Sequence, residues 1–200
     1  MKLQQACQLI ADASPGAVLV STMGAMNALD RLGIGQPRLS SVPLMGGAPS
    51  LALGLALARP EQAVVVLDGD ASLLMQLGGL VTVAGQQPRN LHHFVMHNGT
   101  QFTGLSNLDI AGPRPVDFCQ VAEGAGYARV YAIDDAADLA QRLPAILAVP
   151  GPVFVALAIE PDAPTFSAEQ PQQDWSDRQF TRMGEEAAAL AQWLHSGAAA

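Results

Sequence analysis

The chain has 200 residues and a formal net charge of −8; half of its residues are hydrophobic and 14% are charged. This length suits one domain with a substantial core, and the composition excludes an intrinsically disordered chain. Lys2 is the only lysine, so no basic surface for nucleic acid is expected, and no apolar stretch is long enough to span a membrane without glycine, proline or charge.

The N-terminal segment predicts a helix. Leu3, Ala6 and Ile10 recur at helical spacing, and a Ser-Pro-Gly segment ends the pattern. Because the segment lacks a secretory pattern, we expect a cytoplasmic protein. Cys7 and Cys119 lie far apart, without metal-ligand spacing, and we expect both to be free thiols.

Apolar runs that alternate with helical patterns make up most of the chain. The runs predict strands at residues 17–21, 38–42, 63–67, 91–96, 127–131 and 153–159. The helical patterns lie at residues 3–11, 51–58, 73–84, 116–122 and 134–147, with a further short helix that ends at Leu32. This alternation predicts an α/β fold, a single doubly wound domain with a mostly parallel central sheet.

The remaining segments are expected to be loops, a linker and a terminal helix. Residues 105–115 are rich in turn-forming residues, as in loops that close over active sites. We expect the domain to cover residues 1–161. Residues 162–200 are expected to form a linker or arm and a C-terminal amphipathic helix.

Two turns precede helices in the first quarter of the chain. The strand at 17–21 leads into Thr22 and Gly24, and this edge has two interpretations: a contribution to a diphosphate site, or a plain turn. Further on, Met45 and Gly46 lie in a glycine- and proline-rich segment before the helix at 51–58. A lone methionine is usually a core residue.

The segment after the strand at 63–67 combines features of an anion site and a metal site. Gly69, Asp70, Ala71 and Ser72 form a small-residue turn that opens a helix, whose free N–H groups favour an anion. A carboxylate in this turn would repel a phosphate unless a divalent cation lay between them. Mg²⁺ fits, because it takes one or two protein ligands and fills its octahedron with phosphate oxygens and water.

The next strand, residues 91–96, ends close to Asn98 and Thr100. Neighbouring parallel strands carry the residues that follow them to one edge of the sheet, where open α/β sheets bind ligands. We therefore expect Asp70 and Asn98 to meet, with the Asn98 side-chain oxygen and the Thr100 carbonyl facing the same ligand. His93 and His97 should face one way along this strand and His92 the other, a poor arrangement for holding one ion. We interpret His93 and His97 as partly buried structural residues, with catalysis by His97 as the less favoured alternative.

The Gly69-Asp70-Ala71 segment, followed after 26 residues by Asn98, resembles the metal–diphosphate signature of thiamine-diphosphate enzymes. The usual form is Gly-Asp-Gly, so Ala71 departs from it. The resemblance implies that Gly69 to Ser72 bind thiamine diphosphate, and that Asp70, Asn98 and Thr100 bind Mg²⁺. The alternative is an ordinary doubly wound domain in which Asp70 only caps a helix.

The segment Pro-Leu-Met-Gly-Gly-Ala-Pro-Ser-Leu-Ala-Leu-Gly-Leu-Ala, from residue 43, looks like the corresponding segment of thiamine-diphosphate decarboxylases. By this resemblance Met45 is the apolar residue that wedges under the cofactor and holds its rings in a V shape, and Gly46 adjoins it. The alternative for Met45 is a core position.

The resemblance covers residues 1–161 and implies the diphosphate-binding (PP) half of such an enzyme. In length the chain is similar to the β subunits of sulfopyruvate and phosphonopyruvate decarboxylases, whose pyrimidine-binding (PYR) half is a separate α chain. The resemblance implies a hetero-oligomeric, thiamine-diphosphate-dependent decarboxylase of a small 2-oxo acid. The glutamate that activates the cofactor would then come from the partner chain, and this chain would carry no catalytic residue. The sequence departs from these relatives at 103–107, Thr-Gly-Leu-Ser-Asn, and only Arg114 lies close enough in sequence to bind an anionic substrate tail.

Two alternatives stay open. One is a component of a thiamine-diphosphate dehydrogenase or a transketolase-like enzyme, which transfers the fragment that a decarboxylase releases. The other is a non-enzymatic phosphate- or nucleotide-binding module of flavodoxin-like build.

Overall fold

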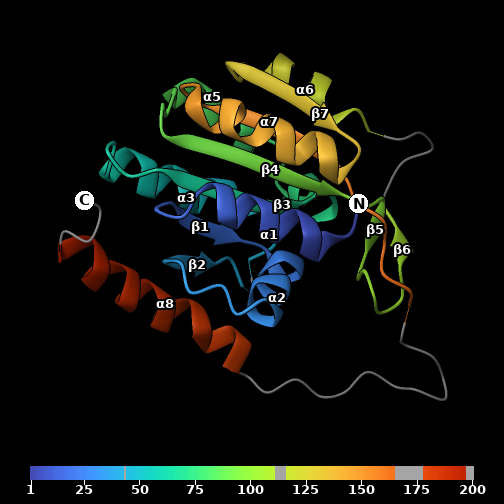
Figure 1. The fold of residues 1–200 in the computed structure, drawn as a ribbon, viewed down its shortest axis with the longest axis horizontal. Coiled ribbons are helices and arrows are strands. Elements are labelled where there is room, and N and C mark those ends of the chain that lie inside the picture. The colour runs from blue at the N-terminus through green and yellow to red at the C-terminus, as the bar shows by residue number, and fades with distance from the viewer. Residues whose placement is uncertain (43, 111–115, 165–177, 197–200) are drawn as a thin grey trace.

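A computed structural model describes residues 1–42, 44–110, 116–164 and 178–196. Its centre is a six-stranded sheet in the order β2-β1-β3-β4-β8-β7, and every pair of neighbours in it is parallel (Figure 1). The expected doubly wound α/β domain is therefore confirmed. The strands are β1 (Val18–Ser21), β2 (Arg38–Ser40), β3 (Val64–Gly69), β4 (Leu91–His97), β7 (Arg129–Ile133) and β8 (Val153–Ala158).

Helices cover both faces of the sheet, because its strands alternate their side chains between two apolar clusters. In β3, Val65 and Leu67 belong to one cluster, and Val64 and Val66 to the other. The first cluster includes buried residues of α1 (Leu3–Ala13), α2 (Met23–Arg31) and α7 (Ala136–Ala148). The second includes residues of α3 (Ala48–Ala58), α4 (Asp70–Met75), α5 (Gly79–Gln86) and α6 (Phe118–Ala125).

The C-terminal helix α8 (Arg178–His195) packs against β2, at the edge of the sheet (Figure 1). Leu190 is buried against Val18 and Leu39. The Glu186 carboxylate accepts hydrogen bonds from the Ser40 N–H at 2.6 Å and from Arg182 Nε at 2.7 Å. Unpaired N–H groups on an edge strand invite pairing with other chains, and α8 covers this one. None of the described helices is long and apolar enough to cross a membrane.

Several elements begin or end a few residues from the expected positions, and two local features differ in kind from the sequence-based expectations. The helix expected at 73–84 begins earlier, at Asp70, and is two helices, α4 and α5, separated at Gln76, which has a non-helical φ of −141°. The expected loop at 105–115 contains a short strand, β6 (Leu108–Asp109), which pairs antiparallel with β5 (Thr100–Gln101). Residues 111–115 of that loop, Arg114 among them, lie outside the described residues.

Candidate functional site

The Asp70 carboxylate joins two loops at the carboxyl edge of the sheet. Its Oδ2 accepts hydrogen bonds from the N–H groups of Asn98 at 3.0 Å and Gly99 at 2.7 Å, and its Oδ1 accepts one from Ala71 at 2.8 Å. Asp70 is the first residue of α4, and Gly69 occupies the N-cap position without a side-chain cap. The residue is 1% exposed, and burial raises the pKa of Asp70, while the bonds from Gly99 and Ala71 act to lower it.

Asn98 organises the turn that follows β4. Its Oδ1 accepts hydrogen bonds from Thr100 N at 2.9 Å and Thr100 Oγ1 at 3.0 Å, and its Nδ2 donates to Thr103 Oγ1 at 2.8 Å. Gly99 has a φ of +73°, a left-handed conformation that lets the chain turn sharply here. Sequence reasoning missed Thr103, although its spacing of three residues from Thr100 is a usable signal in a turn.

A second loop is fixed against α4 by Gly46 and Ser72. The Gly46 N–H donates to Ser72 Oγ at 2.9 Å, and Gly46 has a φ of +81°. A Cβ at Gly46 would lie 2.7 Å from the Gln76 Cβ, so the loop fits into the gap between α4 and α5. Met45, next to it, is 39% exposed and is therefore not a closed-core residue.

Thr22 and Gly24 lie differently with respect to this edge. Thr22 is the N-cap of α2, and its N–H and Oγ1 both donate to the Leu67 carbonyl, at 3.0 and 3.4 Å. A Cβ on Gly69 would lie 3.9 Å from the Thr22 Oγ1. Thr22 is thus a neighbour of the Gly69–Asp70 turn. A Cβ on Gly24 would lie 3.7 Å from the Leu3 side chain, so that side of Gly24 faces α1.

The three histidines of β4 have separate surroundings. His92 Nε2 lies 3.2 Å from the Val149 carbonyl, whereas His93 is buried between Asp68 and Tyr127. His97 Nε2 lies 4.0 Å from Asp70 Oδ2. His93 is therefore fully buried, and not partly as expected, because the apolar cluster of α3, α5 and α6 covers it.

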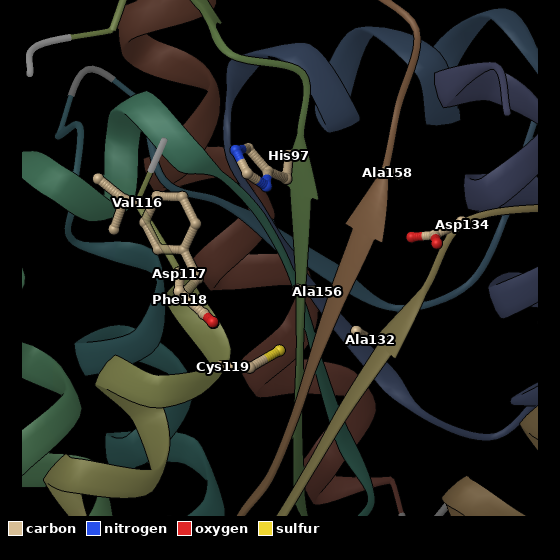
Figure 2. Close-up of a pocket in the computed structure, with 9 residues that line it drawn as sticks. All are labelled: His97, Val116, Asp117, Phe118, Cys119, Ala132, Asp134, Ala156 and Ala158. Carbon is tan, nitrogen blue, oxygen red and sulfur yellow. The ribbon is translucent and has the colours of Figure 1, made fainter. Parts of the chain in front are cut away.

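His97 also lines a cavity of about 280 Å³ beside the carboxyl ends of β4, β7 and β8. Figure 2 shows the His97 ring pointing toward the Phe118 ring, and their centroids are 5.0 Å apart. Asp117 and Asp134 contribute carboxylates to the lining, and Cys119 contributes a thiol. Two carboxylates make this cavity a poor receptor for an anionic group.

The donor set at the edge fits Mg²⁺ better than a transition metal. Within residues 1–42, 44–110, 116–164 and 178–196, no cluster of three or more His, Cys, Asp or Glu residues could hold a metal ion. Asp70 and the Asn98–Thr100 turn instead bring oxygen donors to this edge, joined through main-chain N–H groups: Asn98 N donates to the Asp70 carboxylate, and Thr100 N donates to the Asn98 amide oxygen. Hard oxygen donors in small number suit an ion that completes its shell with phosphate and water.

Comparisons with known proteins identify the family of this chain. Residues 36–157 match the family described as thiamine pyrophosphate enzyme, C-terminal TPP binding domain; thiamine pyrophosphate is thiamine diphosphate. The chain is 39% identical over 157 residues to a phosphonopyruvate decarboxylase of Streptomyces hygroscopicus, a match that covers 77% of this chain and 38% of that protein. It is 42% identical over 117 residues to the sulfopyruvate decarboxylase subunit beta of Methanothermobacter thermautotrophicus, which covers 58% of this chain and 59% of that one.

A solved structure supports the fold. It is a protein from Mycobacterium smegmatis described as a candidate thiamin diphosphate-dependent enzyme, with a TM-score of 0.67 at 19% identity, covering 80% of this chain and 32% of that one.

The chain spans well under half the length of the phosphonopyruvate decarboxylase that it matches. The family match covers more than half of the chain, from β2 through most of β8. The chain belongs to the C-terminal thiamine-pyrophosphate-binding domain family of thiamine pyrophosphate enzymes.

Proposed function

We propose that this chain is the diphosphate- and Mg²⁺-binding subunit of a thiamine-diphosphate-dependent decarboxylase that acts on a small 2-oxo acid. The observation that supports it best is the hydrogen-bonded contact of Asp70 with the Asn98 turn, at the carboxyl ends of adjacent parallel strands. The family match and the decarboxylase names of the relatives support the reaction class.

In this proposal, Asp70, Asn98 and Thr100 hold Mg²⁺ through oxygen atoms. Gly69, Ala71 and Ser72 line the diphosphate from the start of α4, and Thr22 and Gly24 do so from the start of α2. Thiamine diphosphate, when bound, supplies the electron sink for the loss of CO₂ from the 2-oxo acid. This chain's own contribution is to bind and orient the cofactor, since hydrogen bonds from the N–H groups of Asn98, Gly99 and Ala71 already hold the Asp70 carboxylate in one place.

Met45 and Gly46 form the apolar side of the proposed site. The bond from Gly46 to Ser72 fixes the loop to the first turn of α4, and Met45 lies beside it with its side chain partly exposed. A side chain in this place is available to support the rings of a cofactor, as the resemblance to the decarboxylases implies. The exposed fraction counts against the alternative of a closed-core methionine.

A separate PYR subunit is the partner that we propose. Large apolar side chains are exposed on the loop before α3, at the end of α4 and in the segment that carries β5 and β6, at Leu44, Met45, Met75, Phe102 and Leu108. Such groups usually mark an interaction surface. The Methanothermobacter relative is named a beta subunit, and this chain matches 38% of the phosphonopyruvate decarboxylase; both are consistent with a second chain that completes the site.

The names of the relatives support sulfopyruvate and phosphonopyruvate as the first acids to test. An anionic substrate tail requires a cation nearby. The cavity beside His97 carries Asp117 and Asp134, so we do not place such a tail there; Arg114, the cation expected from the sequence, lies outside the described residues.

Calorimetry with the full chain and its partner tests the proposal. We expect Mg²⁺-dependent thiamine-diphosphate binding that Asp70→Ala abolishes, because the carboxylate is the one charged ligand in the proposed set. Asp134→Ala is the matched control: it removes an aspartate at the same sheet edge but outside the set, and binding should persist. Unchanged affinity in Asp70→Ala would sink the assignment.

A further inference from the structure

Asp68, His93 and Tyr127 form a buried polar chain beneath the proposed metal site. His93 Nε2 lies 3.3 Å from Asp68 Oδ2, and His93 Nδ1 lies 3.2 Å from the Tyr127 hydroxyl. Asp68 and His93 have no exposed surface, and Tyr127 is 6% exposed. At its other end the chain reaches the main chain, because Asp68 Oδ1 accepts a hydrogen bond from the Gly69 N–H at 2.8 Å.

Asp68 takes a position that the fold would otherwise give to an apolar residue. Along β3, Val64 and Val66 point into the apolar cluster of α3, α5 and α6, and Asp68 is the next residue of the same face. On β4, Leu91 and Val95 share that face with His93, and the His93 ring contacts Phe154 edge-on at 5.2 Å. A buried carboxylate is costly, and apolar residues of similar volume often stabilise a fold as well or better. A specific role is therefore the better explanation of this carboxylate.

With an ionised Asp68 and a neutral His93 ring, the hydrogen bonds of this chain are all satisfied in one direction. A carboxylate only accepts, so Nε2 of His93 donates to Asp68 and Nδ1 accepts from the Tyr127 hydroxyl. Burial, and next the Asp68 charge, raise the pKa of Tyr127, which keeps this hydroxyl protonated and able to donate. The direction runs from Tyr127 through His93 to Asp68, whose other oxygen is left for Gly69.

We propose that Asp68, His93 and Tyr127 are positioning residues that hold the Gly69–Asp70 turn in the conformation that presents Asp70 to Mg²⁺. The role of Asp70 in this inference rests on the proposed function. The geometry carries the rest. The Gly69 N–H donates to one oxygen of the Asp68 carboxylate, the other oxygen lies against the His93 ring, and the His93 ring lies against the Tyr127 hydroxyl. Supporting bonds of this kind keep a metal ligand in place.

Tyr127→Phe in the full chain is the test, because it removes one hydroxyl separated from Gly69 by two side chains. Without it the His93 ring loses its second hydrogen bond, and Asp68 is held less firmly. We expect the Gly69 amide to exchange with solvent roughly fivefold faster relative to the Val66 amide of the same strand, as for loss of one hydrogen bond. With the partner present, half-saturation of thiamine-diphosphate binding should need roughly tenfold more Mg²⁺.

Tyr131→Phe is the matched control. Tyr131 lies on β7, and its ring packs under the Arg142 guanidinium, 5.4 Å away, and not against His93. It should change neither measurement. Asp68→Asn, which keeps the volume of the side chain and removes its charge, gives a second test and should change both measurements in the same direction as Tyr127→Phe.

The outcomes separate the inference from the proposed function. If Tyr127→Phe and Asp68→Asn lower stability but leave the Gly69-to-Val66 exchange ratio and the Mg²⁺ requirement at wild-type values, the network only packs the core and the inference is wrong. If the wild-type protein binds no thiamine diphosphate with Mg²⁺, the proposed function fails. The exchange ratio then decides by itself whether the network holds the turn, and an unchanged ratio overturns that too.

Discussion

Gly46→Ala is expected to damage the loop that carries Met45. Gly46 has a φ of +81°, and a left-handed conformation costs an alanine about 1–2 kcal/mol. Its new Cβ would lie 2.7 Å from the Gln76 Cβ, 3.1 Å from the Gln76 nitrogen and 3.1 Å from the Ser72 carbonyl. These atoms are main chain or next to it, so overpacking adds about 1–3 kcal/mol. The free energy of unfolding should fall by about 2–5 kcal/mol.

Urea unfolding of the full chain measures this change, with Gly54→Ala as the matched control. A Cβ at Gly54 would meet nothing within 4 Å, and Gly54 lies inside α3. Alanine there should stabilise the chain by up to about 1 kcal/mol, because glycine is the weaker helix former. A loss below about 1 kcal/mol for Gly46→Ala would show that the loop is not seated against Gln76 as described.

Two further changes test the surroundings of the site. Met45→Ala should reduce turnover more than stability, since Met45 is 39% exposed. Truncation of a core methionine lowers the free energy of unfolding by about 2–5 kcal/mol, and a loss of that size with turnover unaltered would contradict the role of Met45 as a wedge under the cofactor. Acid should loosen α8. Hydrogen bonds from Arg182, and also from Arg38, lower the pKa of Asp30 in the folded state. The stability that these pairs give is therefore present above the ordinary pKa of 3.8 and is lost as the pH falls through the lower pKa of the folded state. In a Trp175→Phe background, quenching of Trp193 fluorescence by a quencher dissolved in the solvent should increase as the pH is lowered over that range. Asp30→Asn should remove this pH dependence.

Most of the sheet could be predicted from the sequence, because burial on both faces demands continuous apolar runs. Val64 to Leu67 illustrate this: each of the residues is buried, and each face of the strand meets its own set of helices. The alternation along β4 was likewise confirmed, with His92 on the face toward α7 and His93 on the other. The approach of Asp70 to Asn98 followed from the parallel order of their strands alone.

The features that could not be predicted depend on contacts between distant residues. The break between α4 and α5 lies where Gly46 packs against Gln76, thirty positions away, and helical periodicity continues across it. The β5–β6 pairing is only two residues long on each side, too short for a strand pattern. Apolar periodicity does not place the Asp68 side chain in the core, whereas it lies there with His93 and Tyr127.

The described glutamates bear on whether this chain could act alone. The chemistry of the family requires a carboxylic acid in an apolar pocket beside the cofactor, where burial shifts its pKa toward neutrality. The side chains of Glu61 and Glu160 are 61% and 60% exposed, and Glu160 pairs with Lys2. Glu186 is the more enclosed, at 14%, but it is bonded to Arg182 and the Ser40 N–H and lies 3.5 Å from Arg38.

The last prediction is that the purified chain has no decarboxylase activity until a PYR subunit is added. Glu123 and Glu185 are exposed on α6 and α8, and Glu169 lies outside the described residues. Two copies of this chain would therefore combine two diphosphate sites with no described acid in an apolar pocket, and the smallest active form we expect is α₂β₂. The assay is CO₂ release from sulfopyruvate, phosphonopyruvate and pyruvate with thiamine diphosphate and Mg²⁺, with and without the partner. Turnover by the chain alone, lost in Glu169→Gln, would mean that the activating acid lies in this chain after all.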